Sequence, residues 1–366
     1  MRILIISEDP LSTATREYYG PTNVASNFEL ILKVLNIDFT IIKNPIRIAS
    51  DSSAYISYFV LDSYNIVLNC AKYFLIACKY DAIVFQYMRG LSAIIYSLTF
   101  WLSDTPILKI IYFKPPWWHV YFLNKYFKNL IVFNPKMVEY LISIGVPQDK
   151  IKVISPPIDV NVFRKMDKKI LRNKYNLESN KYILLYHGRP SVARGLILFL
   201  ETTEALRDRG EDFVALLSLA DVSDDISPKY VRDYINEHRL GSNIRILTGK
   251  NNAAEIYNIA DVVIFPFLKN SAICPALSIL EAMACECIII ASDVDSSCIT
   301  HVLKNEYNGF LINPTTNDLI ICLNNIKKKS HETINDVGIN ARLTIQEHCS
   351  FKKTKELLYS ILEDLC

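Results

Sequence analysis

The sequence lacks any segment that is long and apolar enough to cross a bilayer. A spanning helix needs roughly 18 to 20 consecutive apolar residues. The nearest stretch, LSAIIYSLTFWL at 91–102, has 12 residues and is typical of a buried helix. The first residues, MRILIISEDP, also lack the basic start and the cleavage site of a signal peptide. We therefore expect a cytoplasmic protein, and binding to the inner face of the membrane is compatible with that location.

The chain also lacks an excess of either charge and any recognisable cysteine motif. Lysine and arginine total 40, and aspartate and glutamate total 38, so no long-range field favours a nucleic acid partner. The nine cysteines contain no Cys-x-x-Cys pair of a zinc site. We interpret them as mostly buried thiols of a reducing compartment.

What the sequence does contain is a repeated alternation of short β-branched runs and helical patterns. This alternation predicts parallel sheets covered by helices, and a chain of 366 residues favours two domains. The expected strands are 2–7, 39–43, 81–86, 106–113, 130–134, 151–159, 182–188, 213–220, 244–249, 261–267, 287–291 and 308–313. The expected helices are 23–35, 135–144, 196–207, 253–260, 277–284 and 354–365.

A charged segment at 156–181 separates the two sets of repeats, since it starts with a double proline and ends in a polar turn. We predict an α/β fold of two Rossmann-like βαβ domains, at 1–165 and 166–345, that face a central cleft. The C-terminal helix at 346–366 is expected to pack back on the first domain. Ligands of open α/β sheets bind at the carboxyl ends of the strands, which makes the cleft the expected site.

The stretch HGRPSVARG at 187–195 lies between an expected buried strand and an expected helix. Gly188 and Gly195 allow a tight turn, while Arg189 and Arg194 place two permanent positive charges at the start of the helix. The stretch is neither a P-loop nor a Gly-x-Gly-x-x-Gly motif. The residues leave two interpretations open, a phosphate site and ordinary surface charge.

The stretch NSAICPALSILEAMACECIIIAS at 270–292 predicts a second helix start at the same edge. Pro275 breaks the chain there, so the backbone N–H groups of Ala276, Leu277 and Ser278 would lack helical partners. The helix dipole favours an anion at that point. Glu281 could accept hydrogen bonds from the vicinal hydroxyls of a ribose, or it could only complete the helix start electrostatically.

Together these stretches resemble a known family. ALSILEAMACECIIIAS resembles the signature of family-4 glycosyltransferases, the retaining, nucleotide-sugar-dependent enzymes with the GT-B fold. HGRPSVARG resembles their Gly-Arg-Leu-x-x-x-Lys-Gly loop, with Arg194 in place of lysine. KVISPPIDVNVF, AAEIYNIADVVIFPF and NEYNGFLINP resemble three further segments of the family, and all five follow the family's order through 150–320.

The resemblance implies roles for individual residues. Arg189 and Arg194 would hold the donor diphosphate and stabilise the charge that grows on the leaving group, and Glu281 would bind the ribose. The resemblance implies no metal, because these two cations would do its work, and no cofactor, because the nucleotide-diphosphate sugar is the donor substrate. The implied donor-binding residues are Gly20, Gly188, Arg189, Arg194, Ile273, Pro275, Ala276, Leu277 and Glu281.

Three positions depart from the family pattern. Ile273 stands where the family often has a second glutamate, and Tyr112 stands where many members have a histidine, with His119 seven residues further on. The family's Ala-x-Gly after the glutamate ends here in Glu286. The catalytic residues that we predict on this basis are Arg189, Arg194, Tyr112 and His119.

We predict a hexosyltransferase-type enzyme that moves a sugar from a nucleotide-diphosphate sugar to an acceptor hydroxyl with retention, in the biosynthesis of a lipid-linked sugar or a surface glycan. Because the family pattern is broken at Ile273 and Tyr112, the alternative is a catalytically silent GT-B scaffold that binds a nucleotide sugar or a partner protein. A sugar-nucleotide epimerase is less favoured, because His187 is the only histidine clearly placed near the expected cleft.

The segment 114–128 bears on the acceptor, because it mixes six aromatic residues with three lysines. Such a mixture suits a membrane interface, where rings lie at headgroup depth and lysines meet anionic lipid. It also suits a core-packed segment with a solvated lysine face, so both interpretations stay open. The first of them predicts a membrane-associated enzyme with a lipid-linked acceptor.

Overall fold

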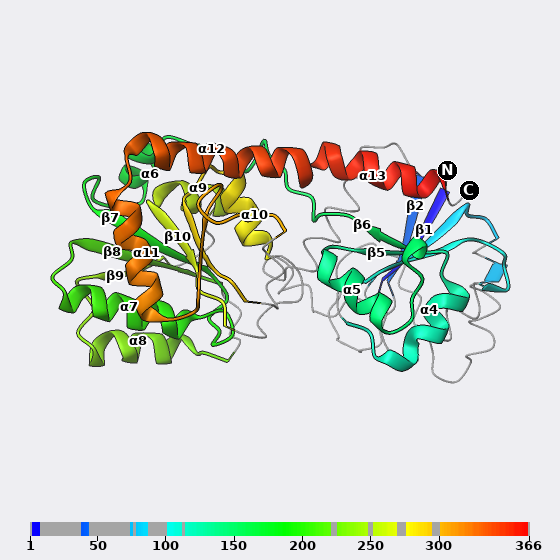
Figure 1. Ribbon diagram of the computed structural model, residues 1–366, viewed down its shortest axis with the longest axis horizontal. Helices are drawn as coiled ribbons and strands as arrows, with labels where there is room; N and C mark the ends of the chain where they lie inside the picture. The colour runs from blue at the N-terminus through cyan, green and yellow to red at the C-terminus, as the bar shows by residue number, and fades with distance from the viewer. Residues whose placement is uncertain are drawn as a thin grey trace, which may run out of the picture. The chain divides into compact units, whose positions relative to one another are not determined.

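The computed structural model describes residues 2–7, 38–43, 74–75, 78–86, 101–111, 114–220, 225–247, 252–268, 276–294 and 301–364. The chain divides into two compact units (Figure 1). Unit 1 is Met1–Pro157 with Thr354–Cys366, and unit 2 is Ile158–Lys353. Each unit contains a six-stranded sheet of parallel strands, as the alternation in the sequence predicts.

The sheet of unit 1 has the order β2-β1-β3-β4-β5-β6. Its strands are β1 (Arg2–Ser7), β2 (Asp38–Lys43), β3 (Ala82–Gln86), β4 (Ile107–Ile110), β5 (Asn129–Val132) and β6 (Ile151–Val153). The described helices of this unit are η2 (Trp117–His119), α4 (Val120–Tyr126), α5 (Pro135–Ser143) and η3 (Gln148–Lys150). β6 ends well before the predicted residue 159, because Pro156 and Pro157 have no N–H to donate to a ladder.

The sheet of unit 2 has the order β12-β11-β10-β7-β8-β9. Its strands are β7 (Tyr182–Gly188), β8 (Phe213–Leu219), β9 (Ile244–Leu247), β10 (Val262–Phe265), β11 (Ile289–Ser292) and β12 (Phe310–Ile312). The described helices of unit 2 are α6 (Lys168–Lys174), α7 (Leu196–Asp208), α8 (Pro228–Glu237), α9 (Ala253–Ile259), α10 (Leu277–Ala284), α11 (Thr316–Lys328) and α12 (His331–His348). α13 (Phe351–Glu363) follows them, and from Thr354 onward it belongs to unit 1.

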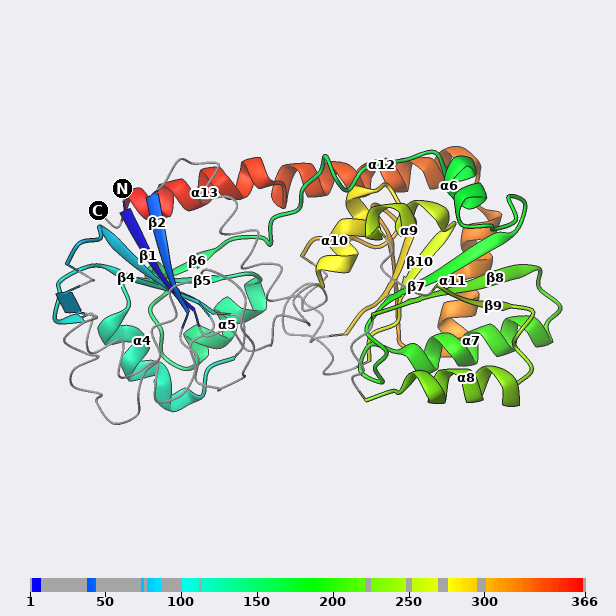
Figure 2. The ribbon, with the colours of Figure 1, turned by 180° about the vertical axis from the view of Figure 1, so that it is seen from behind.

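Helices cover both faces of the sheet in unit 2. α7 and α8 lie on one face, and α9 and α10 lie on the other (Figures 1 and 2). Because successive residues of a strand point to opposite faces, Leu184 and Tyr186 of β7 join the apolar core under α7 and α8. His187 points to the opposite face, where its ring meets Tyr257 of α9. Among the described residues, no helix combines the length and the hydropathy of a membrane span.

The linker between the two sets of strands packs with unit 2. The sequence analysis predicted that the first domain ends at residue 165. In the structure, unit 2 begins at Ile158. The guanidinium of Arg342, on α12, donates to the carbonyl oxygens of Val160 and Phe163, each at 3.1 Å. These bonds hold the linker against α12.

The turn after α10 has a backbone conformation that favours glycine. Glu286 has a φ of +60°, in the left-handed region that costs a side-chain-bearing residue about 1–2 kcal/mol. Its carboxylate lies 3.0 Å from the ammonium of Lys165 and 3.9 Å from Nε of Arg342. Gly338 of α12 approaches this turn so closely that a Cβ would lie 2.6 Å from the Glu286 carbonyl oxygen. The packing of α12 on this turn therefore requires a glycine in the middle of that helix.

Candidate functional site

In the sheet of unit 2, the order in which the chain adds strands reverses between β7 and β10. The chain runs from β7 to β8 and β9 on one side, and then places β10, β11 and β12 on the other side. Ligands of open α/β sheets bind at the carboxyl ends of the strands at such a switch point. The loop that follows β7, at 189–194, and the residues that follow β10, Pro266 and Phe267, lie at this position.

Gly195 brings these two segments together. It has a φ of +75°, and a Cβ at this position would lie 1.7 Å from the Pro266 carbonyl oxygen. The backbone N–H of Leu268 also donates to the Ala193 carbonyl at 3.0 Å. Only glycine fits such a close approach of two backbones. The tight turn predicted from the sequence is present, and Gly195 is the N-cap of α7.

The two arginines of the loop lie at the end of β7. The guanidinium carbon of Arg194 lies 5.6 Å from the centre of the Phe267 ring, and its Nη1 would lie 3.7 Å from a Cβ on Gly188. Stacking on a ring limits the freedom of a guanidinium. The carbonyl of Arg189 accepts a hydrogen bond from the Tyr186 hydroxyl at 2.9 Å, which fixes the start of the loop.

Glu281 lies on α10 and makes a hydrogen bond to α9. Its Oε2 accepts from the Tyr257 hydroxyl at 3.1 Å. Burial raises the pKa of Glu281 to about 7, and the hydrogen bond from Tyr257 offsets part of that rise. Burial also raises the pKa of Tyr257 well above its ordinary value, so its hydroxyl stays protonated and donates. Sequence analysis did not single out Tyr257, although it lies in the quoted segment AAEIYNIADVVIFPF.

His187 connects this pair to the arginine loop. Its ring lies 5.0 Å from the Tyr257 ring at 74°, and its Nδ1 lies 3.0 Å from the Ser218 hydroxyl. Burial lowers the pKa of His187 to about 4, and the positive charge of Arg194 adds to that effect. The ring is therefore neutral near pH 7. A row of neighbouring side chains runs from Arg194 through His187 and Tyr257 to Glu281.

We expect His187 and Glu281 to give protein stability opposite dependences on pH. The pKa of His187 falls from 6.5 to about 4 on folding, so its contribution is complete above pH 6.5 and is lost as the pH falls toward 4. The pKa of Glu281 rises from 4.5 to about 7, so its contribution is complete below pH 4.5 and is lost as the pH rises toward 7. Each loss amounts to about 3 kcal/mol.

Urea unfolding between pH 4.5 and 6.5 tests this expectation, because the two slopes of about 1.4 kcal/mol per pH unit oppose each other in wild type. Relative to wild type, Glu281→Gln should gain stability as the pH rises through this window. His187→Gln should lose stability over the same window. Parallel pH profiles for wild type and both variants would contradict the protonation states assigned to this row.

The start of α10 has the form expected from the sequence. Ala276 is the N-cap and has no side-chain cap bond, and Leu277 is the first helical residue and is buried. The hydroxyl oxygen of Ser278 is buried and has no hydrogen-bond partner among the described residues. The start of α10 thus brings together backbone N–H groups and the hydroxyl of Ser278.

The remaining predicted site residues fall in two groups. His119 lies in η2 of unit 1, with its ring 3.8 Å from that of Trp118, and burial together with the charge of Lys109 lowers its pKa. Its assignment as a catalytic residue stays a prediction. Four predicted residues lie outside the described residues, and their roles also stay predictions: Gly20, Tyr112, Ile273 and Pro275.

The second unit of the chain is similar in sequence to a known family of proteins. Residues 167–343 match the family model for glycosyl transferases group 1. The match lies within unit 2, which spans Ile158–Lys353. No curated protein sequence matches the chain.

Solved structures match the whole chain. A glycosyltransferase from Rickettsia africae ESF-5 is 18% identical with a TM-score of 0.78, and the match covers 100% of this chain and 98% of that one. HepE from Anabaena, in complex with UDP, is 14% identical with a TM-score of 0.77 over 100% of both chains. Sucrose-phosphate synthase from Thermosynechococcus elongatus is 17% identical with a TM-score of 0.73, covering 100% of this chain and 98% of that one. The fold is GT-B, as the sequence predicts.

Proposed function

We propose that the protein is a glycosyltransferase that moves a sugar, with retention, from a nucleotide-diphosphate sugar to an acceptor hydroxyl. The observation that supports this most strongly is the set of side chains at the switch point of unit 2: the charge of Arg194 acts on His187, His187 packs on Tyr257, and Tyr257 donates to Glu281. A guanidinium suits a diphosphate, and a carboxylate suits a pair of vicinal hydroxyls. One nucleotide sugar offers both.

In this proposal the loop after β7 acts on the leaving group. Arg194 is held against the Phe267 ring, so its donors are oriented before the donor substrate binds. When the bond to the sugar breaks, negative charge grows on the diphosphate, and a pre-positioned cation stabilises that charge. Arg189 would add a second cation from the same loop. The protein would thereby lower the barrier to departure of the nucleotide.

A uridine nucleotide is the first donor to test. Structures of HepE are described with UDP, with UDP and glucose, and with UDP-glucose. We therefore propose a UDP-hexose as the donor of this chain. In the proposed complex, Glu281 would accept hydrogen bonds from the ribose hydroxyls, and the start of α10 would face the phosphates or the sugar.

A panel of nucleoside diphosphates tests the proposal. One base should raise the melting temperature by roughly 5–10 °C at a hundred times its Kd, because binding then adds about 2.7 kcal/mol. The matching sugar nucleotide should be turned over by wild type, and Arg189→Ala should slow that turnover about 100-fold. Binding without any turnover would favour the silent scaffold instead. Neither binding nor turnover with any base would contradict the proposal.

We also propose a lipid-linked acceptor, on the basis of a surface of unit 1. Two residues of α4, Leu123 and Tyr126, are buried and pack in the core. Trp117, Trp118 and Tyr121 are instead 73%, 47% and 59% exposed. The ammonium of Lys125 lies 5.4 Å from the centre of the Tyr121 ring. Exposed rings beside a lysine suit the headgroup region of an anionic membrane.

Vesicle co-sedimentation tests this part of the proposal. Wild type should sediment with anionic vesicles and less with neutral ones, and the double change of Trp117 and Trp118 to serine should reduce sedimentation at least severalfold. Tyr230→Ser, on α8 of unit 2, is a matched control because Tyr230 is also half-exposed. Equal sedimentation of the double variant and wild type would remove the support for a lipid-linked acceptor.

A further inference from the structure

We propose that Tyr257 is a positioning residue for the donor, because it holds the Glu281 carboxylate in the orientation that receives the two hydroxyls of the donor's ribose. The inference rests on the proposed function and adds to it a residue outside the predicted site. Tyr257 belongs to α9 and Glu281 to α10, and the bond between them joins two helices on the same face of the sheet.

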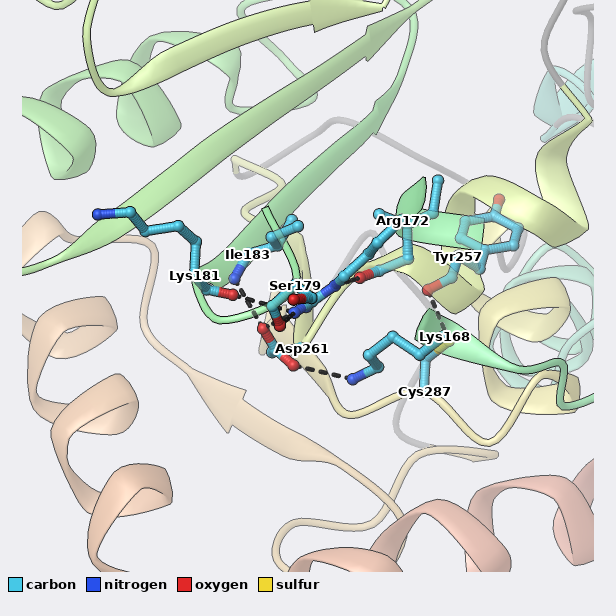
Figure 3. A network of polar contacts seen from close by, with 9 residues as sticks. Lys168, Arg172, Ser179, Lys181, Ile183, Tyr257, Asp261 and Cys287 are labelled. Carbon is cyan, nitrogen blue, oxygen red and sulfur yellow. Dashed lines mark hydrogen bonds and ion pairs between the residues drawn. The ribbon is translucent and has the colours of Figure 1, made fainter. Parts of the chain in front are cut away.

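The Tyr257 side chain is fixed from several directions. It is 0% exposed, and its ring packs edge-on against His187 at 5.0 Å and tilted against Phe163 at 6.4 Å. Its backbone is held as well, because its carbonyl accepts a hydrogen bond from the Cys287 thiol at 3.3 Å (Figure 3). Because the ring cannot swing away, its hydroxyl presents a donor at one place beside α10.

The hydrogen bond has a specific consequence for Glu281. The last torsion of a glutamate side chain is broad, so a carboxylate without a fixed partner samples many orientations. The Tyr257 hydroxyl engages one acceptor position on Oε2, and an ionised carboxylate has about four such positions. The other acceptor positions of the Glu281 carboxylate then have fixed directions relative to one another. Such an arrangement suits a ligand that offers two adjacent hydroxyls.

The same bond affects the charge of Glu281. A hydrogen bond to the carboxylate favours its ionised form and opposes the effect of burial. The titratable groups around the pair are His187, Cys285 and Cys287. Burial lowers the pKa of the first and raises the pKa values of both thiols, so all three are neutral near pH 7. The charges of Arg194 and Arg342 do not change in this range. Glu281 is thus the group of this cluster that titrates near neutral pH.

Titration calorimetry with UDP and 2′-deoxy-UDP tests the proposal. A hydrogen bond to a charged group contributes about 1.5–3 kcal/mol, so wild type should prefer UDP at least tenfold. Tyr257→Phe should reduce that preference to about threefold or less, with little change in affinity for 2′-deoxy-UDP. Tyr175→Phe is the matched control, because its hydroxyl donates to Glu255 at 2.9 Å elsewhere in unit 2. This control should keep the full preference.

The pH dependence of UDP affinity gives a second readout that a purely structural role would not change. In wild type the affinity should fall as the pH drops below about 7, because Glu281 gains a proton. In Tyr257→Phe the midpoint should move to higher pH. In the background of Glu281→Gln, the Tyr257→Phe change should have no further effect on the preference for UDP, which separates positioning from loss of folding.

The outcomes are distinct. If folded Tyr257→Phe keeps both the preference for UDP and the wild-type pH midpoint, the positioning role is wrong. If wild type binds neither nucleotide, the proposed uridine donor is wrong instead.

Discussion

Asp261→Asn is expected to destabilise unit 2 by about 3–5 kcal/mol, because it removes the counter-ion of a buried guanidinium. Asp261, just before β10, accepts hydrogen bonds from Arg172 at 2.6 Å, from the Lys168 ammonium at 2.8 Å and from the Ile183 backbone N–H at 2.7 Å (Figure 3). Arg172 is only 4% exposed. One carboxylate therefore joins α6 to the starts of β7 and β10.

The other bonds of Arg172 explain why the loss should be large. Its remaining donors reach the carbonyls of Ile259, Ser179 and Lys181 at 2.9–3.1 Å. These bonds keep the guanidinium buried after the carboxylate is neutralised, and a buried charge without its partner is costly.

Urea unfolding of wild type and Asp261→Asn measures this effect. Asp233→Asn is the control, because Asp233 pairs with Lys229 on the exposed surface of α8, and such pairs contribute less than about 1 kcal/mol. A loss of stability in Asp261→Asn no larger than in Asp233→Asn would contradict the central place of this carboxylate in unit 2.

Arg194→Ala is expected to lower the kcat of sugar transfer about 100- to 1000-fold, because it removes a cation positioned for the leaving diphosphate. Arg194→Lys should keep activity within about tenfold of wild type, since lysine retains the charge but not the fork or the stacking on Phe267. Kinetics with saturating donor would show these effects.

A control for this prediction lies at the far end of the helix that follows Arg194. Arg209 is the exposed C-cap residue of α7, at the far end from Arg194, so Arg209→Ala should change kcat less than about twofold. An Arg194→Ala enzyme that is folded and retains the wild-type kcat would exclude Arg194 from the chemistry.

Local patterns predicted much of the fold. β7 and α10 have the predicted bounds, 182–188 and 277–284, because each apolar run is delimited by a glycine or a proline. α11 and α12 were not predicted. The Gly338 in the middle of α12 argues against a helix locally, and its reason is a contact with the carbonyl of Glu286, which only the folded chain reveals.

The candidate site was also predicted only in part from the sequence. Gly195, Arg194 and Glu281 could be proposed from the sequence because glycines, charges and a proline mark loops and helix starts within a few residues. Tyr257 was missed because its bond to Glu281 joins residues 24 positions apart. The protonation states of His187 and Glu281 follow from burial, which no short sequence pattern contains.

The central claim is that Arg194 and Glu281 bind opposite ends of one nucleoside diphosphate. Calorimetric titration of UDP, UMP and 2′-deoxy-UDP into wild type, Arg194→Ala and Glu281→Gln tests it most directly. Arg194→Ala should lose the preference for UDP over UMP, and Glu281→Gln should lose the preference for UDP over 2′-deoxy-UDP. If both variants bound all three nucleotides with wild-type affinities, the claim would be wrong.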